Sequence, residues 1–353
     1  MGTKRSTMIF NAPKTCFPGC SRSGYSWVEV LAVIVILLLL FALLMPGLGH
    51  PREASYRMTC AFHLKQLGLA LHNYHDMYRT FPPAIMGHSI DRTLEEGNFE
   101  RMSGLVLLLP YLEQSNLYEQ NMEMQQQEDR TQLPWHNLKV EQLLCPTASR
   151  FVHGGNPTNY AFCIGDSVQI LPEPSQATGA FGGSLARKFT EFTDGTSYTI
   201  LMGEIAIPRG LALQGQIAID QPRAMLNDPR LCWQTRDSKT PYYLPKVALH
   251  PQGRGWLWED GIAGMPMFNT LLPPNAPSCA VGGSDGVDGI YSAGSYHVGG
   301  SQVLFADGSS RFIAENINAK QKSDGASRNR NPYGVWGALG TVAGEEELDA
   351  RNY

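Results

Sequence analysis

The sequence SGYSWVEVL, residues 23–31, leads directly into an apolar run that ends at Met45. From Tyr25 to Met45 the only charged side chain is that of Glu29. An apolar helix of about 20 residues is long enough to cross a bilayer. A carboxylate in hydrocarbon is costly unless a partner neutralises it. If the chain is cut after Gly24, the new amino group of Tyr25 lies about one helical turn from Glu29 and supplies that partner.

Residues 1–24 form a basic leader. Its charged side chains are all positive: Lys4, Arg5, Lys14 and Arg22. The leader lacks the apolar centre of a secretory signal peptide, and its positive charge favours the cytoplasmic side of a membrane. We therefore expect a single-pass protein of the inner membrane, with its N-terminus in the cytoplasm and its head in the periplasm.

These residues resemble the processing signal of type IV prepilins. The resemblance implies that a prepilin peptidase cuts between Gly24 and Tyr25 and methylates the new amino group, which Glu29 then neutralises during assembly. Tyr25 replaces the commoner phenylalanine, and Trp27 stands where an aliphatic residue is usual. Pro46 falls where pilins often carry a proline and should kink or end the membrane helix. The alternative is an uncleaved signal anchor that contains one glutamate.

The composition gives a net charge of −4, and without the four leader cations 24 basic residues face 32 acidic ones. An acidic exterior argues against nucleic acid as a partner. Two of the seven cysteines, Cys16 and Cys20, lie in the leader. An exported head meets an oxidising compartment, so disulfides are expected among the other five. The first predicted pair is Cys60 with Cys145, and the second is Cys232 with Cys279.

The chain divides into a leader (1–24), a transmembrane helix (25–46), an amphipathic stem helix (47–80) and a globular head (81–353). The stem is predicted from apolar residues that recur at steps of three and four: Leu64, Leu67, Leu71, Tyr74 and Tyr78. This stripe should pack on a sheet of the head. The sequence Phe81-Pro82-Pro83 then ends the helix.

The head is rich in glycine, proline and short apolar runs, a pattern typical of strands and loops. Asp307-Gly308, between two β-prone runs, predicts a hairpin over 302–313. A short strand is expected at 143–146, a loop-rich insertion at 206–290, and a polar, loosely held tail from Lys320. The predicted fold class is α+β: a long N-terminal pilin-like helix, its inner half transmembrane, packed on a β-rich, loop-rich head.

Further segments carry a second resemblance. They are the stem CAFHLKQLGLALHNYHD (60–76), FPP (81–83), LPYLEQ (109–114), LCP (144–146), NY (159–160), TDGTS (193–197), GE (203–204), and His297 followed after nine residues by Asp307-Gly308. Together they resemble prepilin-like proteins with a DUF1559 head, a family abundant in planctomycete-type bacteria that carries an H-X9-DG processing-associated motif. The segment 61–63 and Tyr198 depart from its usual asparagines. The resemblance implies no settled molecular function for the head.

Two groups of side chains invite a chemical role. His297 could bond to a backbone group or to Asp307 across the turn, and Gly299 and Gly300 permit a tight turn. Structural locking is favoured over partner contact or general-base catalysis, since no nucleophile motif lies beside the pair. Asp285 and Asp288 share a glycine-rich loop, where a plain turn is favoured over a calcium site because the spacing departs from the EF-hand pattern.

The predicted function is structural: a pilin or pseudopilin-like subunit, not an enzyme. Its expected partners are prepilin peptidase, other pilin-like subunits or secretion machinery, and membrane lipid. No cofactor is expected apart from the calcium alternative. The competing hypothesis is a membrane-tethered periplasmic binding module that recognises a glycan, peptide or solute. Trp233, Trp256 and Trp258 would then form a stacking surface, although they could equally be core residues.

Overall fold

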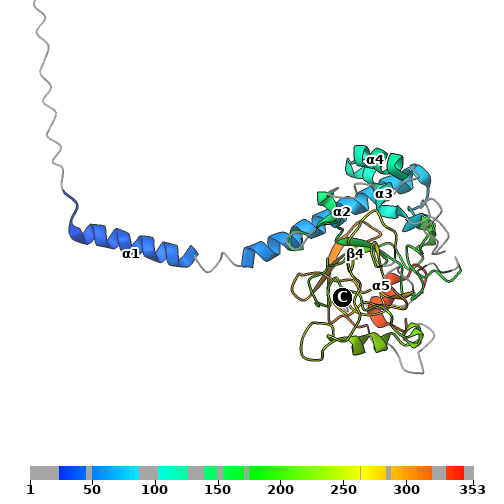
Figure 1. Cartoon of the computed structure of the whole chain (residues 1–353). Helices are drawn as coiled ribbons and strands as arrows, with labels where there is room; N and C mark the ends of the chain where they lie inside the picture. The colour runs from blue at the N-terminus through cyan, green and yellow to red at the C-terminus, as the bar shows by residue number, and fades with distance from the viewer. Residues whose placement is uncertain are drawn as a thin grey trace, which may run out of the picture. The chain divides into compact units, whose positions relative to one another are not determined.

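A computed structural model describes residues 24–44, 50–86, 102–125, 139–148, 154–170, 172, 175–262, 264–283, 288–319 and 331–345. The chain forms two compact units, Met1–Pro51 and Arg52–Tyr353 (Figure 1). The first unit contains helix α1 (Trp27–Leu44). Helix α2 (His50–Tyr78) begins at the end of the first unit and lies almost entirely in the second. The predicted leader, up to residue 23, lies outside the described residues.

Helix α1 is apolar on every side. Apart from Glu29 its side chains are hydrophobic, and those from Trp27 to Phe41 are exposed. The backbone N–H of Ser26 donates to Glu29 Oε2 at 3.0 Å, so this carboxylate caps the first turn of the helix. Among the helices of the described residues, none combines the length and apolarity required to cross a membrane. The expected spanning segment 25–46 extends past α1 into residues 45–46, which are not described.

The second unit is built on a five-stranded sheet with the order β5-β3-β4-β8-β9. Its strands are β3 (Tyr160–Cys163), β4 (Ile200–Glu204), β5 (Met267–Phe268), β8 (Gly300–Phe305) and β9 (Ser310–Ala314). Strands β3 and β5 are parallel, and the other pairs are antiparallel. The predicted hairpin is confirmed: β8 and β9 pair through the turn at 306–309. The mixed α+β class is likewise confirmed.

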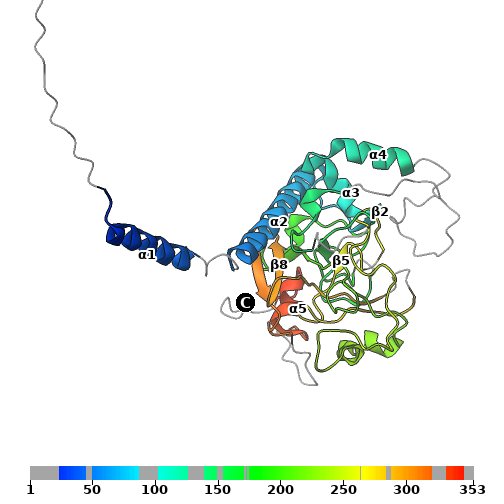
Figure 2. The ribbon, with the colours of Figure 1, turned by 60° about the vertical axis from the view of Figure 1, so that its left-hand side comes forward.

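Helix α2 lies along one face of this sheet (Figure 2). Its predicted stripe is buried at Leu64, Leu67 and Leu71, which share one hydrophobic core with residues of β3, β4 and β8. Between them Gly68 brings the helix backbone close to Leu304 of β8. The stripe fades at the end of the helix, where Tyr78 is exposed. The stem is therefore part of the core of the second unit.

The opposite face of the sheet is covered by helix α5 (Gly334–Gly340). Trp336 is fully buried there and stacks on Phe268 of β5 with ring centroids 6.4 Å apart. The prediction of a loosely held tail from Lys320 is wrong for this part of it. This segment is ordered because burial of the large Trp336 ring stabilises it, although the residues around it are polar.

Short elements complete the unit. They are β1 (Ile85–Met86), β2 (Met102–Ser103), α3 (Gly104–Leu108), η3 (Leu109–Leu112), α4 (Ser115–Gln125), η5 (Glu141–Leu143), η7 (Phe189–Glu191), η8 (Arg223–Leu226), η9 (Pro229–Thr235), β6 (Cys279–Ala280) and β7 (Gly289–Ile290). The strand expected at 143–146 is wrong: a 3-10 turn occupies 141–143, because the chain there runs to the stem instead of joining the sheet. Loops dominate 206–290, as expected.

Candidate functional site

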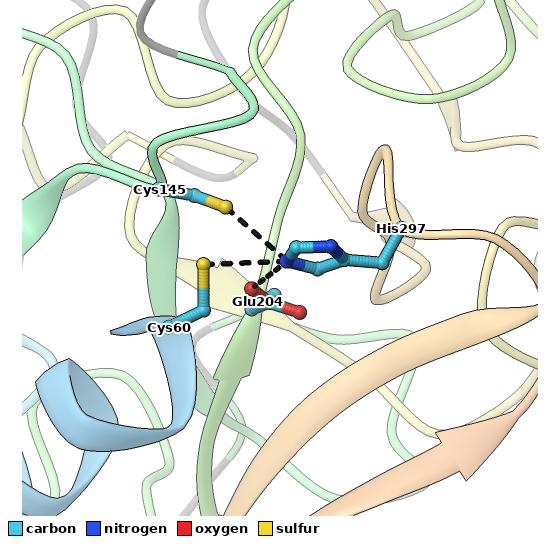
Figure 3. A group of neighbouring side chains, drawn as sticks. All are labelled: Cys60, Cys145, Glu204 and His297. Carbon is cyan, nitrogen blue, oxygen red and sulfur yellow. Dashed lines mark hydrogen bonds and ion pairs between the residues drawn. The ribbon is translucent and has the colours of Figure 1, made fainter. Parts of the chain in front are cut away.

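Four buried side chains from distant parts of the sequence meet between α2 and the sheet (Figure 3). They are Cys60, Cys145, Glu204 and His297, and their ligand atoms all lie within 4.8 Å of one another. His297 Nε2 is the common point, 3.3 Å from Cys60 Sγ, 3.4 Å from Cys145 Sγ and 3.5 Å from Glu204 Oε1. We refer to these four residues as the Cys-Cys-Glu-His cluster.

The stem supplies the first member. Cys60 stands one turn before Leu64 on the buried stripe of α2, so the packing that buries the stripe also buries the thiol. His63, three residues after Cys60 on α2, donates from Nδ1 to the Leu144 carbonyl at 3.0 Å. This bond holds the chain that carries Cys145 against α2.

The sheet and its loops supply the other three. The Cys145 N–H donates to Asn159 Oδ1 at 2.9 Å, which anchors the loop to the start of β3. Glu204 ends β4, and its Oε2 accepts the backbone N–H of Gln302 in β8 at 2.7 Å. His297 precedes β8, where its N–H donates to Ser295 Oγ at 3.1 Å. A hydrogen bond to a neighbouring segment therefore holds Cys145 and Glu204, and a bond within its own loop holds His297.

The outer nitrogen of His297 has its own partner. Nδ1 lies 2.7 Å from Glu53 Oε1, on the first turns of α2. Because an ionised carboxylate can only accept a hydrogen bond, Nδ1 carries a proton and donates it. The imidazole is thereby oriented with Nε2 directed at the two thiols and Glu204.

Electrostatics couple the members of the cluster. Hydrogen bonding by Cys60 lowers the pKa of Cys145 to about 6, against the opposing effect of burial and with help from His297. The same bond raises the pKa of Cys60. Burial alone would lower the pKa of His297, but bonds to Cys145 and Glu204 raise it to about 10. The two pKa shifts favour a thiolate at Cys145 beside a protonated His297 in the metal-free cluster.

Three kinds of chemistry use such groups. A thiolate beside an imidazole is the pair of a cysteine nucleophile, but here the His297 side chain is fully buried and Cys145 is only 3% exposed. Among the described residues, the sulfur is therefore closed to a substrate as the groups are packed. Two thiols so close could also oxidise to a disulfide. Thiolate, imidazole and carboxylate are, finally, all ligands of transition metals.

The predicted disulfides have different outcomes. The expected Cys60–Cys145 bond is absent from the structure: both residues are free cysteines, and each sulfur lies within 3.4 Å of His297 Nε2. Cys232 and Cys279 do form a disulfide, which closes a loop of the 206–290 region. Cys163 is free and buried on the α5 side of the sheet.

The H-X9-DG residues do not pair as expected. His297 contacts the cluster and Glu53, whereas Asp307 Oδ1 accepts the Ser309 N–H at 2.8 Å within the hairpin turn. Gly308 has φ +80°, which suits the tight turn. The neighbouring Ala306 carbonyl accepts a bond from His72 Nε2 of α2 at 3.0 Å. The motif thus binds α2 at two points, near Cys60 and near His72, about 18 Å apart along the helix.

The other candidate residues are not members of the cluster. Gly24 has open space around it, Tyr25 is 88% exposed and Glu29 caps α1. Asp288 accepts the Ile170 N–H at 3.2 Å and so ties a loop to the sheet region. Asp285, the other calcium candidate, lies outside the described residues.

A known protein family matches the part of the chain that builds this site. The family described as "Protein of unknown function (DUF1559)" matches residues 49–320. The chain belongs to this family. No curated protein and no solved structure matches the chain. The matched range includes the stem and all four members of the cluster, so the DUF1559 region contains the whole site.

Sequence reasoning did not assemble the cluster, although the signal was partly present. Each member stands in one of the segments that carry the DUF1559 resemblance: the stem, LCP, GE and H-X9-DG. Glu53 lies before the first of them. A search for cysteine, histidine and acidic residues among these segments would have found the four members, but not their proximity.

Proposed function

We propose that this DUF1559 protein is a membrane-anchored, pilin-like structural subunit that is cut after Gly24 and assembles with other subunits into a pseudopilus or secretion-system fibre. It has no catalytic role in this proposal. The head stands on the outer side of the inner membrane, and the stem carries it.

The surface of α1 carries the proposal. Its side chains are exposed from Trp27 to Phe41 although nearly all are hydrophobic. A helix without a polar face is not stable in water and requires cover on every side. Lipid supplies that cover before assembly, and the α1 helices of neighbouring copies supply it afterwards.

The cleavage point supports the same proposal. Gly24 and Tyr25 precede α1, and Tyr25 is among the most exposed large side chains of the described residues. A peptidase can therefore reach the bond between them. In the uncut chain Glu29 accepts from the Ser26 N–H, and cutting would place a cationic amino group within the same turn. The carboxylate then gains a charged partner, and the attraction between the two charges is strong where the dielectric constant is low.

The binding-module alternative is not favoured by the aromatic residues that suggested it. Trp258 is fully buried in the core beneath α2, and Trp233 packs in a separate core with Arg236 over its ring at 4.6 Å. The ring of Trp256 lies against Gly155. The three rings therefore belong to different environments and form no common stacking surface.

Processing provides the test. The full chain is expressed with a prepilin peptidase that cuts a reference pilin in the same cells, and the detergent-extracted protein is analysed by intact mass and N-terminal sequencing. We expect wild type and Gly19→Ala, a control at another leader glycine, to begin at N-methylated Tyr25. Gly24→Ala should keep the leader. Wild-type protein that retains residues 1–24 would overturn the proposal.

Assembly is tested separately. Glu29→Ala should still be cut, but it should lose the subunit-to-subunit cross-links that wild type gives in membranes. The reason is that the amino group of Tyr25 would then have no carboxylate partner in an apolar environment. Equal cross-linking of the two proteins would refute the role of Glu29.

A further inference from the structure

We propose that the Cys-Cys-Glu-His cluster binds one zinc ion, with Cys60, Cys145, Glu204 and His297 as its four ligands. The ion fastens the stem helix to the head. This site is independent of the pilin-like function proposed above, because it lies wholly within the second unit.

The distances within the cluster are those of a tetrahedral site before the ion is bound. With metal–sulfur bonds of about 2.3 Å and metal–nitrogen bonds of about 2.0 Å, sulfur and nitrogen ligands of a tetrahedral zinc lie about 3.6 Å apart. His297 Nε2 lies 3.3 Å from Cys60 Sγ and 3.4 Å from Cys145 Sγ. The ligands therefore need only small shifts to admit the ion.

The donor set selects the metal. Two thiolates and an imidazole favour zinc over calcium or magnesium, which prefer oxygen ligands. Glu204 supplies the fourth ligand through Oε1. This oxygen is buried, and its contact with His297 Nε2 is long, at 3.5 Å. A buried carboxylate oxygen without a short hydrogen bond is costly, and a cation at the centre of the cluster removes that cost.

The groups around the cluster are arranged as in known metal sites. His297 donates its outer N–H to Glu53, the carboxylate–histidine arrangement that orients metal-binding histidines. Glu204 Oε2 accepts from the Gln302 N–H, which leaves Oε1 for the ion. Thr147 Oγ1 lies 2.8 Å from Cys145 Sγ and can donate to the thiolate.

The burial of the ligands defines the role of the site. All four are buried, and each comes from a different segment: α2, the loop after η5, strand β4 and the loop before β8. Four protein ligands leave no open position for a substrate, so the site is structural. Because the unfolded chain holds no such cluster, binding favours the folded state. The ion thereby joins Cys60 of the stem to the three ligands from the sheet and its loops.

A Cys60–Cys145 disulfide is the competing state, and it would exclude zinc by removing both thiolates. The test uses the full-length protein purified without chelator and without oxygen, from cells grown with zinc. Metal content is measured by mass spectrometry. We expect about one zinc per chain in wild type and in Cys163→Ser, a control at a free buried cysteine outside the cluster. The Cys60→Ser/Cys145→Ser double variant should lose the metal.

A second measurement needs no variant. Wild type is treated with a thiol-alkylating reagent under mild denaturation, with and without a zinc chelator, and the labelled peptides are identified. Chelator should strongly increase labelling of Cys60 and Cys145 and leave Cys163 unchanged. Replacement by cobalt(II) should give the intense visible bands of a tetrahedral thiolate site. Metal-free wild type, metal retained by the double variant, or a Cys60–Cys145 disulfide in the anaerobic protein would each overturn the proposal.

Discussion

Gly68 of α2 lies against Leu304 of β8 so closely that a Cβ on the glycine would come within 3.0 Å of Leu304 Cδ1. A larger side chain must therefore push the stem away from the sheet. We predict that Gly68→Phe lowers the free energy of unfolding by about 1–3 kcal/mol. Gly68→Ala should be close to neutral, since the flexible end of Leu304 can move and alanine favours a helix by about 1 kcal/mol.

Denaturant unfolding of the detergent-solubilised full chain measures this effect. Leu69→Phe is the matched control, because Leu69 is the next residue of α2 and is 63% exposed. It should unfold at the wild-type denaturant concentration. The same midpoint for Gly68→Phe and Leu69→Phe would show that the stem does not pack on β8.

Local sequence patterns predicted both elements that meet at the contact of Gly68 with Leu304, the stem helix α2 and the β8–β9 hairpin. The three- and four-residue steps of Leu64, Leu67 and Leu71 are a property of one helix, and Asp307-Gly308 between two apolar runs is a property of one hairpin. Both are found where they were predicted. Two other predictions were wrong: the strand at 143–146 and the loosely held tail, part of which forms α5. Tertiary contacts decide the structure of both segments.

The cluster was beyond such patterns for a different reason. Its members stand at positions 60, 145, 204 and 297, so no short spacing relates them. The cysteine count led instead to a predicted Cys60–Cys145 disulfide. That prediction brought the two cysteines together, and in the structure both are free and share His297 Nε2 as a neighbour, which nothing in the sequence indicates.

The contact between Glu53 and His297 leads to a prediction about metal affinity. If zinc occupies the cluster, Glu53→Ala should weaken its binding roughly 10- to 100-fold, since the carboxylate orients the imidazole and raises its basicity. Glu53→Gln should have a smaller effect because its amide oxygen still accepts from Nδ1. Competition with a chromophoric chelator measures the affinity. Asp76→Asn, at an exposed acid on the same helix, should bind zinc as wild type does.

Comparison of Glu53→Ala with Asp76→Asn also separates two explanations of weaker zinc binding. A general effect of charge on α2 would weaken binding in Asp76→Asn as well. An effect through His297 is confined to Glu53, whose oxygen lies 2.7 Å from Nδ1. Unchanged zinc affinity in Glu53→Ala would show that the histidine needs no such support.

The Cys232–Cys279 disulfide should stabilise the loop-rich region. It joins residues 47 apart in the sequence. A bond that closes a loop of this length typically contributes about 2–4 kcal/mol. We predict that Cys232→Ser/Cys279→Ser loses this amount and that hydrogen exchange becomes faster in 206–290. Cys163→Ser, which removes a buried thiol but no bond, should leave exchange in that region unchanged; equal exchange in the double variant would contradict the prediction.

The buried carboxyl of Glu259, which is not a member of the cluster, predicts a pH dependence of stability. Burial raises the pKa of its carboxyl to about 8, although bonds from its own backbone and from Asn156 oppose the shift and Asp260 adds to it. Asn156 Nδ2 donates to Oε1 at 2.6 Å. The pKa in the unfolded chain is about 4.3. The folded state therefore binds this proton more tightly, and its stabilising effect is complete below pH of about 4 and lost as the pH rises through about 8.

The Glu259→Gln variant cannot ionise at this position, so its stability should lack this dependence. We expect wild type to lose stability relative to Glu259→Gln by up to about 1.4 kcal/mol per pH unit between roughly pH 5 and 8. Unfolding curves of both proteins across that range measure the difference, which cancels the titration of other groups. Glu315→Gln is the matched control, since Glu315 also accepts from an asparagine amide, that of Asn275, but is exposed. Parallel curves for wild type and Glu259→Gln would mean that Glu259 ionises in the folded protein much as it does in the unfolded chain.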